Sequence, residues 1–218
     1  MFFNLHTHHF TDDSEILELV NQYPDEFKAT PYFSIGIHPW RINQSRLADD
    51  LEMIISKLAD DNCLALGECG LDKRIETPID EQIEVFEKQL HLAEKFNKPV
   101  VLHCVAAYQE VIDAKNRLNI SVPMIIHGFS KNEQVAKQLL DNGFYLSFGK
   151  YLLRNPELES VFKSVPDDRF FLETDMIDET IREVYNLAAK YKAISPDVLH
   201  KIIDGNFKTV FKADQSGN

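Results

Sequence analysis

The chain alternates short apolar runs with longer amphipathic segments, and this alternation limits the fold more than any other feature. Continuous apolar runs bounded by polar segments are typical of parallel strands that are covered on both faces. The segment Ile16–Tyr23 fits either a further strand or a short helix. The sequence predicts seven clear strands, at Phe2–His8, Tyr32–His38, Cys63–Cys69, Val100–Cys104, Met124–Phe129, Phe144–Phe148 and Phe170–Asp175.

The segments between these runs carry helix signals. The sequence of residues 130–133, Ser-Lys-Asn-Glu, has the spacing of a capping box, and Gly143 is a suitable C′ residue for the helix that would follow. Ser195 and Pro196 are typical of the N-cap and first position of a last helix. One apolar stripe has helical spacing and consists of Ile79, Ile83, Phe86, Leu90 and Ala93.

Strands that alternate with helices predict βα units and a parallel sheet. Seven or eight such units favour an α/β fold of the TIM-type barrel class, near the lower length limit of that fold. From the alternation alone, a doubly wound open sheet is an equal competitor.

The polar residues at the strand ends favour the barrel. Six of the seven apolar runs finish in or close to an imidazole or a carboxylate, and the residues concerned are His6, His8, His38, Glu68, His103, His127 and Asp175. In a closed parallel barrel the carboxyl ends of the strands converge at one mouth, where such enzymes place their active sites. Any one of these residues alone has an ordinary structural explanation, but independent structural histidines have no reason to gather at strand ends.

Several imidazoles with two carboxylates suit two divalent ions. These ligand types fit Zn²⁺, Mn²⁺, Co²⁺ or Fe²⁺, and Mg²⁺ is less favoured by so much nitrogen. A pair of such ions lowers the pKa of a water molecule and binds the attacking and leaving oxygens of a displacement. The reaction class that the pattern indicates is hydrolysis.

Composition limits the class of protein. The 218 residues carry a formal net charge of −12, which opposes a role in coating nucleic acid, so no stable nucleic-acid complex is expected. No apolar run is long enough to cross a membrane, and the N-terminal segment does not resemble a secretory signal. Three cysteines indicate reduced thiols and a cytoplasmic location, with Cys69 and Cys104 in the core. We predict one domain over residues 1–212 and a frayed tail over 213–218.

The motifs resemble those of the TatD family, which are metal-dependent hydrolases of the amidohydrolase superfamily. Gln82, Phe86, Gln89, Ala93 and Asn206 also match, and the resemblance covers nearly the whole chain in the family's order. The matching motifs are His6-Thr7-His8, Gly36-Ile37-His38-Pro39-Trp40, Gly67-Glu68-Cys69-Gly70-Leu71-Asp72, Pro99-Val100-Val101-Leu102-His103, His127-Gly128-Phe129-Ser130 and Glu173-Thr174-Asp175. The resemblance implies a (β/α) barrel, a divalent-metal site and hydrolase activity, with deoxyribonuclease activity as the leading expectation.

Carried over by position, the resemblance implies a role for each site residue. His6, His8 and Asp175 would hold one ion, His103 and His127 the other, and Glu68 would bridge them. Asp175 would also act as general base. His38 would contact the substrate phosphate, with a structural histidine bonded to a loop carbonyl as the alternative. Trp40 would stack on a base or cover the barrel mouth, and Ser130 would cap a helix start that faces an anion.

The departures from the family pattern leave alternatives open. Val105 stands where the family usually has an arginine suited to a phosphate, although Lys73 and Arg74 could supply part of that charge. A second hypothesis is therefore a hydrolase of the same superfamily that acts on a small phosphoester, a lactone or an amide. A third is a metal-binding scaffold without catalysis.

The chain is also short near its start. Only 29 residues lie between His8 and His38, at positions 9 to 37, where the family places a helix, a strand and another helix. We therefore predict a barrel with one thin side, where a helix is missing.

Overall fold

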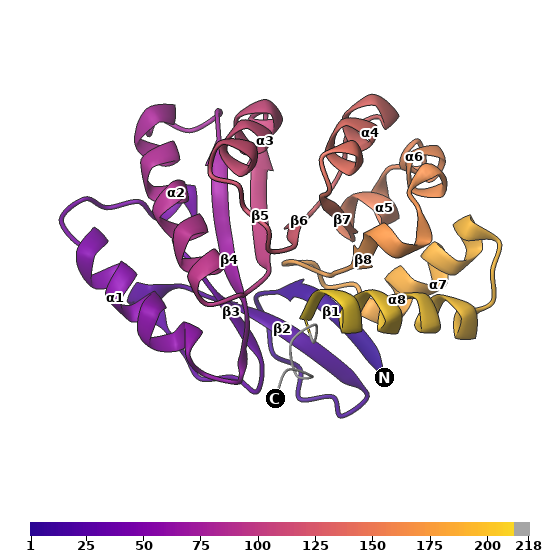
Figure 1. Cartoon of the computed structure of the whole chain (residues 1–218). Helices are drawn as coiled ribbons and strands as arrows, with labels where there is room; N and C mark the ends of the chain where they lie inside the picture. Colours follow the sequence, from indigo (N-terminus) through magenta and orange to yellow (C-terminus); the bar gives the residue numbers. More distant parts are fainter. Residues whose placement is uncertain (212–218) are drawn as a thin grey trace. The chain divides into compact units, whose positions relative to one another are not determined.

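The computed structural model describes residues 1–211 (Figure 1). The strands are β1 (Phe2–Thr7), β2 (Ile16–Gln22), β3 (Phe33–Ile35), β4 (Cys63–Asp72), β5 (Val100–Val105), β6 (Met124–Ile126), β7 (Tyr145–Phe148) and β8 (Phe170–Leu172). The helices are α1 (Leu47–Leu58), α2 (Ile79–Lys95), α3 (Tyr108–Arg117), α4 (Glu133–Asp141), α5 (Lys150–Arg154), α6 (Leu158–Ser164), α7 (Ile181–Lys192) and α8 (Pro196–Phe211). Short 3₁₀ helices are η1 (Pro24–Glu26), η2 (Pro39–Arg41) and η3 (Asp167–Arg169).

The strand order in the sheet follows the chain, from β1 to β8. The pairings β2–β3, β3–β4, β4–β5, β5–β6 and β7–β8 are all parallel. A doubly wound open sheet reverses its strand order at a switch point, and this sheet does not. The fold is therefore a TIM-type barrel, as predicted, and the open-sheet alternative is wrong.

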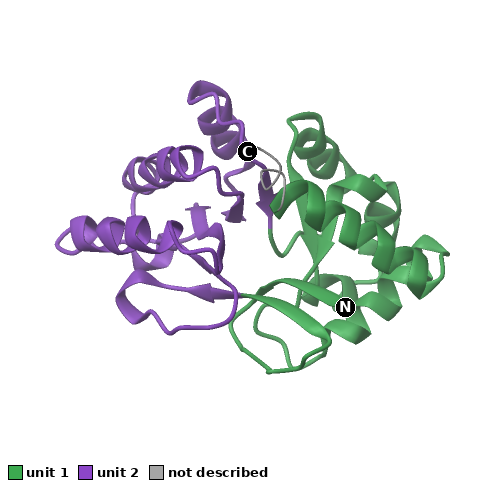
Figure 2. Cartoon of the chain, turned by 60° about the horizontal axis from the view of Figure 1, so that its bottom comes forward, with its two compact units in different colours: residues 1–19, 127–218 green, residues 20–126 purple. Residues whose placement is uncertain are grey.

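The chain divides into two compact units (Figure 2). One unit holds residues 1–19 and 127–218, and the other holds residues 20–126, so the boundary falls inside β2. The prediction of one domain over residues 1–212 stays a prediction, and the tail at 213–218 lies outside the described residues. Within residues 1–211, no helix combines the length and apolarity needed to cross a membrane.

In the unit of residues 20–126, helices α1 and α2 both pack against β4. The β4–β5 pairing runs from Leu66 opposite Val100 to Asp72 opposite Val105. Gly70 has a φ of +142°, and a Cβ at this position would lie 1.9 Å from the His103 carbonyl oxygen. The two strands can approach this closely because Gly70 has no side chain.

In the unit of residues 1–19 and 127–218, the apolar face of β1 packs on the last two helices. The Phe3 ring contacts the rings of Phe207 and Phe211, with centroids 4.7 and 5.4 Å apart. The Tyr185 hydroxyl of α7 accepts a hydrogen bond from the Phe3 N–H and donates one to the Phe3 carbonyl, each at 3.1 Å. These contacts fix the strand whose far end carries His6 and His8.

The short N-terminal region folds as the sequence predicts. The ambiguous segment Ile16–Tyr23 forms β2, and in the described chain the connections from β1 to β3 contain only the 3₁₀ helix η1. The thin side with a missing helix is thereby confirmed. A carboxylate helps to order the β1–β2 connection, since Glu18 accepts hydrogen bonds from the N–H and the hydroxyl of Thr11 at 2.8 and 3.0 Å.

One helix start differs from the sequence-based expectation. The predicted capping box at Ser130 is wrong, because Asn132 is the N-cap of α4 and its Oδ1 accepts from the Val135 N–H at 3.0 Å. A capping box does form at Thr180 and Glu183, where α7 begins. Gly143 ends the α4 region with a φ of +78°, and α8 begins at Pro196 as predicted.

The apolar stripe of α2 is rotated relative to the predicted one. Ile79 and Ile83 are only half-buried, whereas Gln82 and Gln89 are about 1% exposed. Phe86, Leu90 and Ala93 are buried as expected. Two amide side chains therefore lie on the buried face of α2, where a purely apolar stripe is expected.

Candidate metal and catalytic site

Each predicted site residue lies at or just beyond the carboxyl end of a strand, except Ser130, Trp40 and Glu68. Glu68 lies inside β4, four residues before its end, because that strand is longer than predicted. The strands β1, β3, β6 and β8 end earlier than predicted, so their imidazoles and carboxylates lie in or next to the loops that follow. The residues form one cluster within each of the two units.

The first cluster lies in residues 20–126 and is centred on Glu68. The Glu68 Oε1 atom lies 3.3 Å from His38 Nε2 and 3.1 Å from His103 Nδ1. One donor atom from each of these three side chains falls within 4.8 Å of the others, and Glu68 is 4% exposed. A buried carboxylate beside the His103 imidazole is a donor pair that suits a divalent ion, so Glu68 and His103 fit the predicted metal.

The hydrogen bonds of His38 differ from those of His103, and they assign its tautomer. His38 Nδ1 accepts the backbone N–H of Trp40 at 3.1 Å, so in the neutral ring the proton is on Nε2. His38 can then donate a hydrogen bond to Glu68 or to a substrate oxygen. The predicted bond from His38 to a loop carbonyl is replaced by this bond from a loop N–H.

The backbone of Glu68 is held from a neighbouring strand. The Glu68 N–H donates to the Oδ1 of Asn21 in β2 at 2.7 Å. The Ser34 hydroxyl of β3 lies 3.5 Å from the same oxygen. Asn21 is 5% exposed, and an amide directly after Leu19 and Val20 is a sequence signal that could have indicated this supporting role.

The same cluster includes Asp72, which the sequence-based assignment left without a role. The Trp40 indole N–H donates to Asp72 Oδ2 at 2.8 Å, and His103 Nε2 lies 3.2 Å from the same oxygen. Burial alone would raise the pKa of Asp72, but hydrogen bonds from Trp40, the Arg74 backbone and His103 hold that pKa below its usual range. Trp40 keeps 67% of its surface exposed although its indole N–H is fixed.

The second cluster lies in residues 1–19 and 127–218. His6 Nε2 and His8 Nε2 lie 3.8 and 3.5 Å from Asp175 Oδ1. The Asp175 N–H donates to the His6 carbonyl at 2.9 Å, and the His8 N–H donates to the Asp175 carbonyl at 3.2 Å. These backbone bonds hold Asp175 beside β1, and its side chain remains 28% exposed.

His127 belongs to this second cluster. Its Nδ1 lies 3.3 Å from Glu173 Oε1, which also accepts the Gly128 N–H at 2.7 Å. Burial alone would raise the pKa of Glu173, but the hydrogen bond and charge of His127, with the charge of His6, lower it. Because a carboxylate only accepts, Nδ1 carries the proton and the Nε2 lone pair of the neutral ring can bind a metal.

Two supporting residues of the second cluster carry no role in the sequence-based assignment. Glu173 appears there only as part of a motif, although it orients His127. Asn4, buried in β1, donates to the Thr174 hydroxyl at 2.8 Å and accepts the Thr174 N–H at 3.0 Å. A buried amide in an otherwise apolar strand is the signal that could have indicated it.

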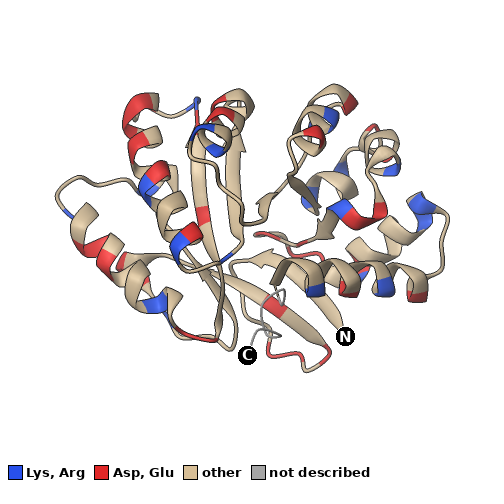
Figure 3. Cartoon of the chain, viewed as in Figure 1, with Lys and Arg blue, Asp and Glu red and all other residues tan. Residues whose placement is uncertain are grey.

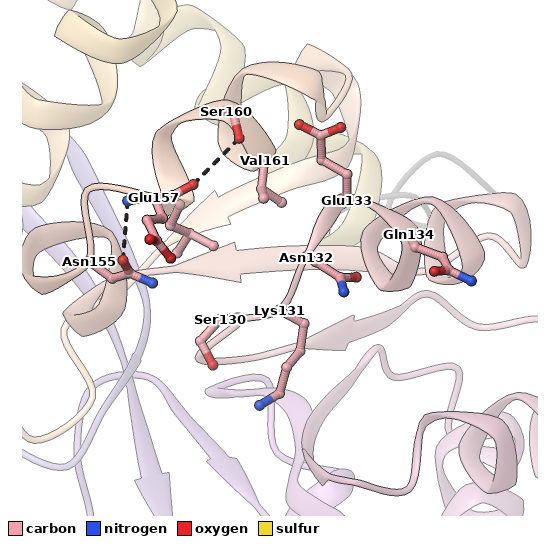
Figure 4. A pocket seen from close by; sticks show the side chains of 10 residues that line it. Ser130, Lys131, Asn132, Glu133, Gln134, Asn155, Glu157, Ser160 and Val161 are labelled. Carbon is pink, nitrogen blue, oxygen red and sulfur yellow. Dashed lines mark hydrogen bonds between the residues drawn. The ribbon is translucent and has the colours of Figure 1, made fainter.

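Ser130 lies apart from these contacts, in a pocket of about 500 Å³. Figure 4 shows Ser130 and Lys131 near one another, with Asn155 and Glu157 on a different segment that lines the same pocket. Asn132 caps α4 here, so the expected role of Ser130 as the cap does not hold.

Lys73, the cation next to Asp72, has an acidic partner. Lys73 forms an ion pair with Glu110, which uses part of the charge that could replace the missing arginine. Figure 3 shows acidic and basic residues alternating along α8, whereas α2 is mostly acidic. These two helices agree with the acidic balance of the chain, whose net charge is −12.

Solved structures and relatives place the fold in a known class. The structure of YJJV, a TatD homologue from Escherichia coli K12, aligns with a TM-score of 0.82 at 20% identity, over 97% of this chain and 98% of that one. A TatD family hydrolase from Entamoeba histolytica aligns with a TM-score of 0.79 at 16% identity, over 96% of this chain and 98% of that one. The uncharacterized metal-dependent hydrolase YcfH of E. coli K12 is 30% identical over 84% of this chain and 75% of its own length. The structural likeness shows that the chain has the barrel fold of these proteins.

The family follows from the sequence match. Residues 2–212 match the model of the TatD-related DNases, and the chain belongs to that family. A further relative, from Edwardsiella piscicida, is named a 3′-5′ ssDNA/RNA exonuclease, TatD. It is 32% identical over 76% of this chain and 64% of its own length.

Proposed function

We propose that this protein hydrolyses phosphodiester bonds in DNA, using divalent ions held by the two clusters. The observation that carries the proposal is the pairing of imidazoles with carboxylates in both clusters, as at Glu68 with His103 and at Asp175 with His8. The family match and the named activity of the Edwardsiella relative support DNA as the substrate. The ligand set is the one predicted from the sequence and contains His6, His8, Glu68, His103, His127 and Asp175.

The proposal includes two ions, with Zn²⁺, Mn²⁺, Co²⁺, Fe²⁺ and Mg²⁺ as candidates. The chemistry of the donors supports it, because imidazole and carboxylate are ligands for these metals. Bound ions supply Lewis acidity, which lowers the pKa of a water molecule and stabilises charge on the phosphate.

The residues of the chain divide the remaining work. Asp175 accepts the proton of the attacking water, since its carboxylate is partly exposed while backbone bonds to β1 fix its position. His38 donates from Nε2 to a phosphate oxygen, and Trp40 offers an exposed ring face to a base. Glu173 keeps His127 in place, and Asn4 keeps Thr174 in place.

The first test is cleavage of single-stranded DNA labelled at the 3′ or the 5′ end. Protein loaded with Mg²⁺, Mn²⁺ or Zn²⁺ is compared with Asp175→Asn, which removes the base and should reduce the rate by about 10²–10⁴-fold. The matched control is Asp178→Asn, an exposed carboxylate in the same loop, which should keep the wild-type rate. The two labels separate removal of terminal nucleotides from internal cutting.

Two outcomes would contradict the proposal. A near-normal rate in Asp175→Asn would refute the role of Asp175 as the base. Absence of cleavage by a protein that binds the ions would favour the other substrates of the superfamily, a small phosphoester, a lactone or an amide. Val105 is the observation that favours this second candidate, because it removes the expected cation at the end of β5.

A further inference from the structure

Asp72 is a buried carboxylate whose atoms all have partners. It is the last residue of β4 and is 2% exposed. Its Oδ1 accepts the Arg74 N–H at 2.9 Å, and its Oδ2 faces both Trp40 Nε1 and His103 Nε2. One oxygen atom therefore contacts both the exposed aromatic ring and the imidazole of the candidate metal cluster.

The position of Asp72 is fixed through its backbone as well. The Gln82 side chain of α2 accepts the Asp72 N–H at 2.8 Å and donates to the Asp72 carbonyl at 3.0 Å. The same amide donates to the Thr77 carbonyl at 2.7 Å, which ties the β4–α2 connection to the helix. A carboxylate held in this way can impose an orientation on its neighbours.

The Asp72 carboxylate favours one of the two tautomers of His103. An ionised carboxylate accepts hydrogen bonds only, so Asp72 at 3.2 Å favours the neutral ring whose proton is on Nε2. The Nδ1 lone pair then faces Glu68 Oε1 at 3.1 Å. Two acceptors at this distance repel each other unless a cation lies between them, which is the arrangement of a metal-ligating histidine with a carboxylate behind it.

We propose that Asp72 is a positioning residue that acts on His103 and Trp40 together. It holds the His103 lone pair toward the ion and holds the Trp40 ring by its indole N–H. The two functions are coupled, because an ion bound at Nδ1 makes the Nε2 proton more acidic and strengthens its bond to the oxygen that Trp40 shares. This inference rests on the proposed metal site but does not require DNA as the substrate.

Substitution by asparagine tests the shared oxygen. An amide in place of the carboxylate has one oxygen and one NH₂ group, whereas three N–H donors face Asp72, from Trp40, His103 and Arg74. In either orientation of the amide, the NH₂ group meets at least one donor. If it faces His103, it also favours the tautomer with the proton on Nδ1, where the ion would bind.

The experiment uses the one tryptophan of the chain, Trp40, as its probe. Zn²⁺ is added to the metal-free protein while Trp40 fluorescence is recorded, and the Zn²⁺ affinity is measured by calorimetry under the same conditions. In wild type, we expect the Zn²⁺ concentration at the midpoint of the fluorescence change to coincide with the midpoint of binding measured by calorimetry. Asp72→Asn should weaken Zn²⁺ binding about 10–100-fold and remove the fluorescence response, with an unchanged circular dichroism spectrum.

Glu110→Gln is the matched control, because Glu110 pairs with Lys73, next to Asp72, and contacts neither ring in the structure. It should keep both the affinity and the response. Zn²⁺ affinity within twofold of wild type in Asp72→Asn, with the response retained, would overturn the proposal. So would a wild-type titration that saturates the protein without changing Trp40 fluorescence, a result that does not depend on any variant folding. Neither readout uses nuclease activity, so failure here is distinct from failure of the proposed substrate.

Discussion

Gly70 shows how a single residue determines the geometry of the site. Its φ of +142° is one that L side chains rarely adopt, and a Cβ there would lie 1.9 Å from the His103 carbonyl oxygen. Because β4 carries Glu68 and Asp72 and β5 carries His103, the close approach of these strands positions three residues of one cluster. Any side chain at position 70 would push the strands apart at this point.

We predict that Gly70→Ala lowers the free energy of unfolding by about 1–3 kcal/mol from steric overlap alone, with backbone strain in addition. Gly205→Ala is the control, because Gly205 lies in α8 with open space around the position of a Cβ. That change should raise stability by about 0.5–1 kcal/mol, since glycine is a poor helix former. Urea unfolding measures both, and a Gly70→Ala protein as stable as wild type would refute the packing argument.

The strand-end residues could be predicted from the sequence, whereas the bonds that their supporting partners make could not. His103 and His127 stand out because an imidazole ends an otherwise apolar run. Asp72, Glu173 and Asn4 act through hydrogen bonds to residues far away in the sequence, and no spacing rule reveals such a bond. The sequence shows where a ligand can be, but the tautomer of each histidine depends on a partner that only the fold brings near.

At the scale of elements, α2 positions two strand ends through amide side chains. Gln82 bonds to both backbone groups of Asp72, and Gln89 accepts the Ile37 N–H at 2.7 Å and donates to the Ile37 carbonyl at 3.1 Å. Ile37 precedes His38 after the short strand β3, which has few ladder bonds of its own. The helix therefore supplies hydrogen bonds that the strand end lacks.

We predict that Gln89→Leu lowers the free energy of unfolding by about 1–3 kcal/mol for each buried backbone group of Ile37 left without a partner. Bound metal should also decrease, because the loop that carries His38 beside Glu68 loses its anchor. Lys88→Ala on the same helix removes an exposed ion pair with Glu84 and should cost about 0.5 kcal/mol or less. Equal effects of the two changes on urea unfolding would show that the amide is not an anchor.

The errors in the element predictions have a common physical origin. Ser130 was expected to cap α4 because Glu133 follows at the right spacing, but Asn132 is closer to the helix and its side chain caps it instead. The α2 stripe was misplaced because buried glutamines count as polar in a hydrophobic pattern. Local spacing identifies that a helix exists, and the competition between neighbouring polar side chains decides its ends and its buried face.

At the scale of the whole molecule, the side chains that can report unfolding are concentrated in one of the two units. Cys63, Cys69, Cys104 and Trp40 all lie in the unit of residues 20–126. Burial raises the pKa of Cys63 and Cys104 to about 12 and raises that of Cys69 well above its usual value. The thiols are therefore protonated at pH 8 and react with a disulfide reagent only after this unit opens.

This distribution tests the prediction of one domain. If residues 1–212 unfold cooperatively, the urea midpoint for exposure of the three thiols coincides with the midpoint of the far-ultraviolet circular dichroism signal, to which helices of both units contribute. We expect coincidence, because the boundary between the units cuts through β2 and neither unit contains a complete set of strands. Thiols that react at a urea concentration where most of the helical signal persists would instead show that residues 20–126 open on their own. Native protein whose thiols react rapidly at pH 8 without urea would contradict the raised pKa values.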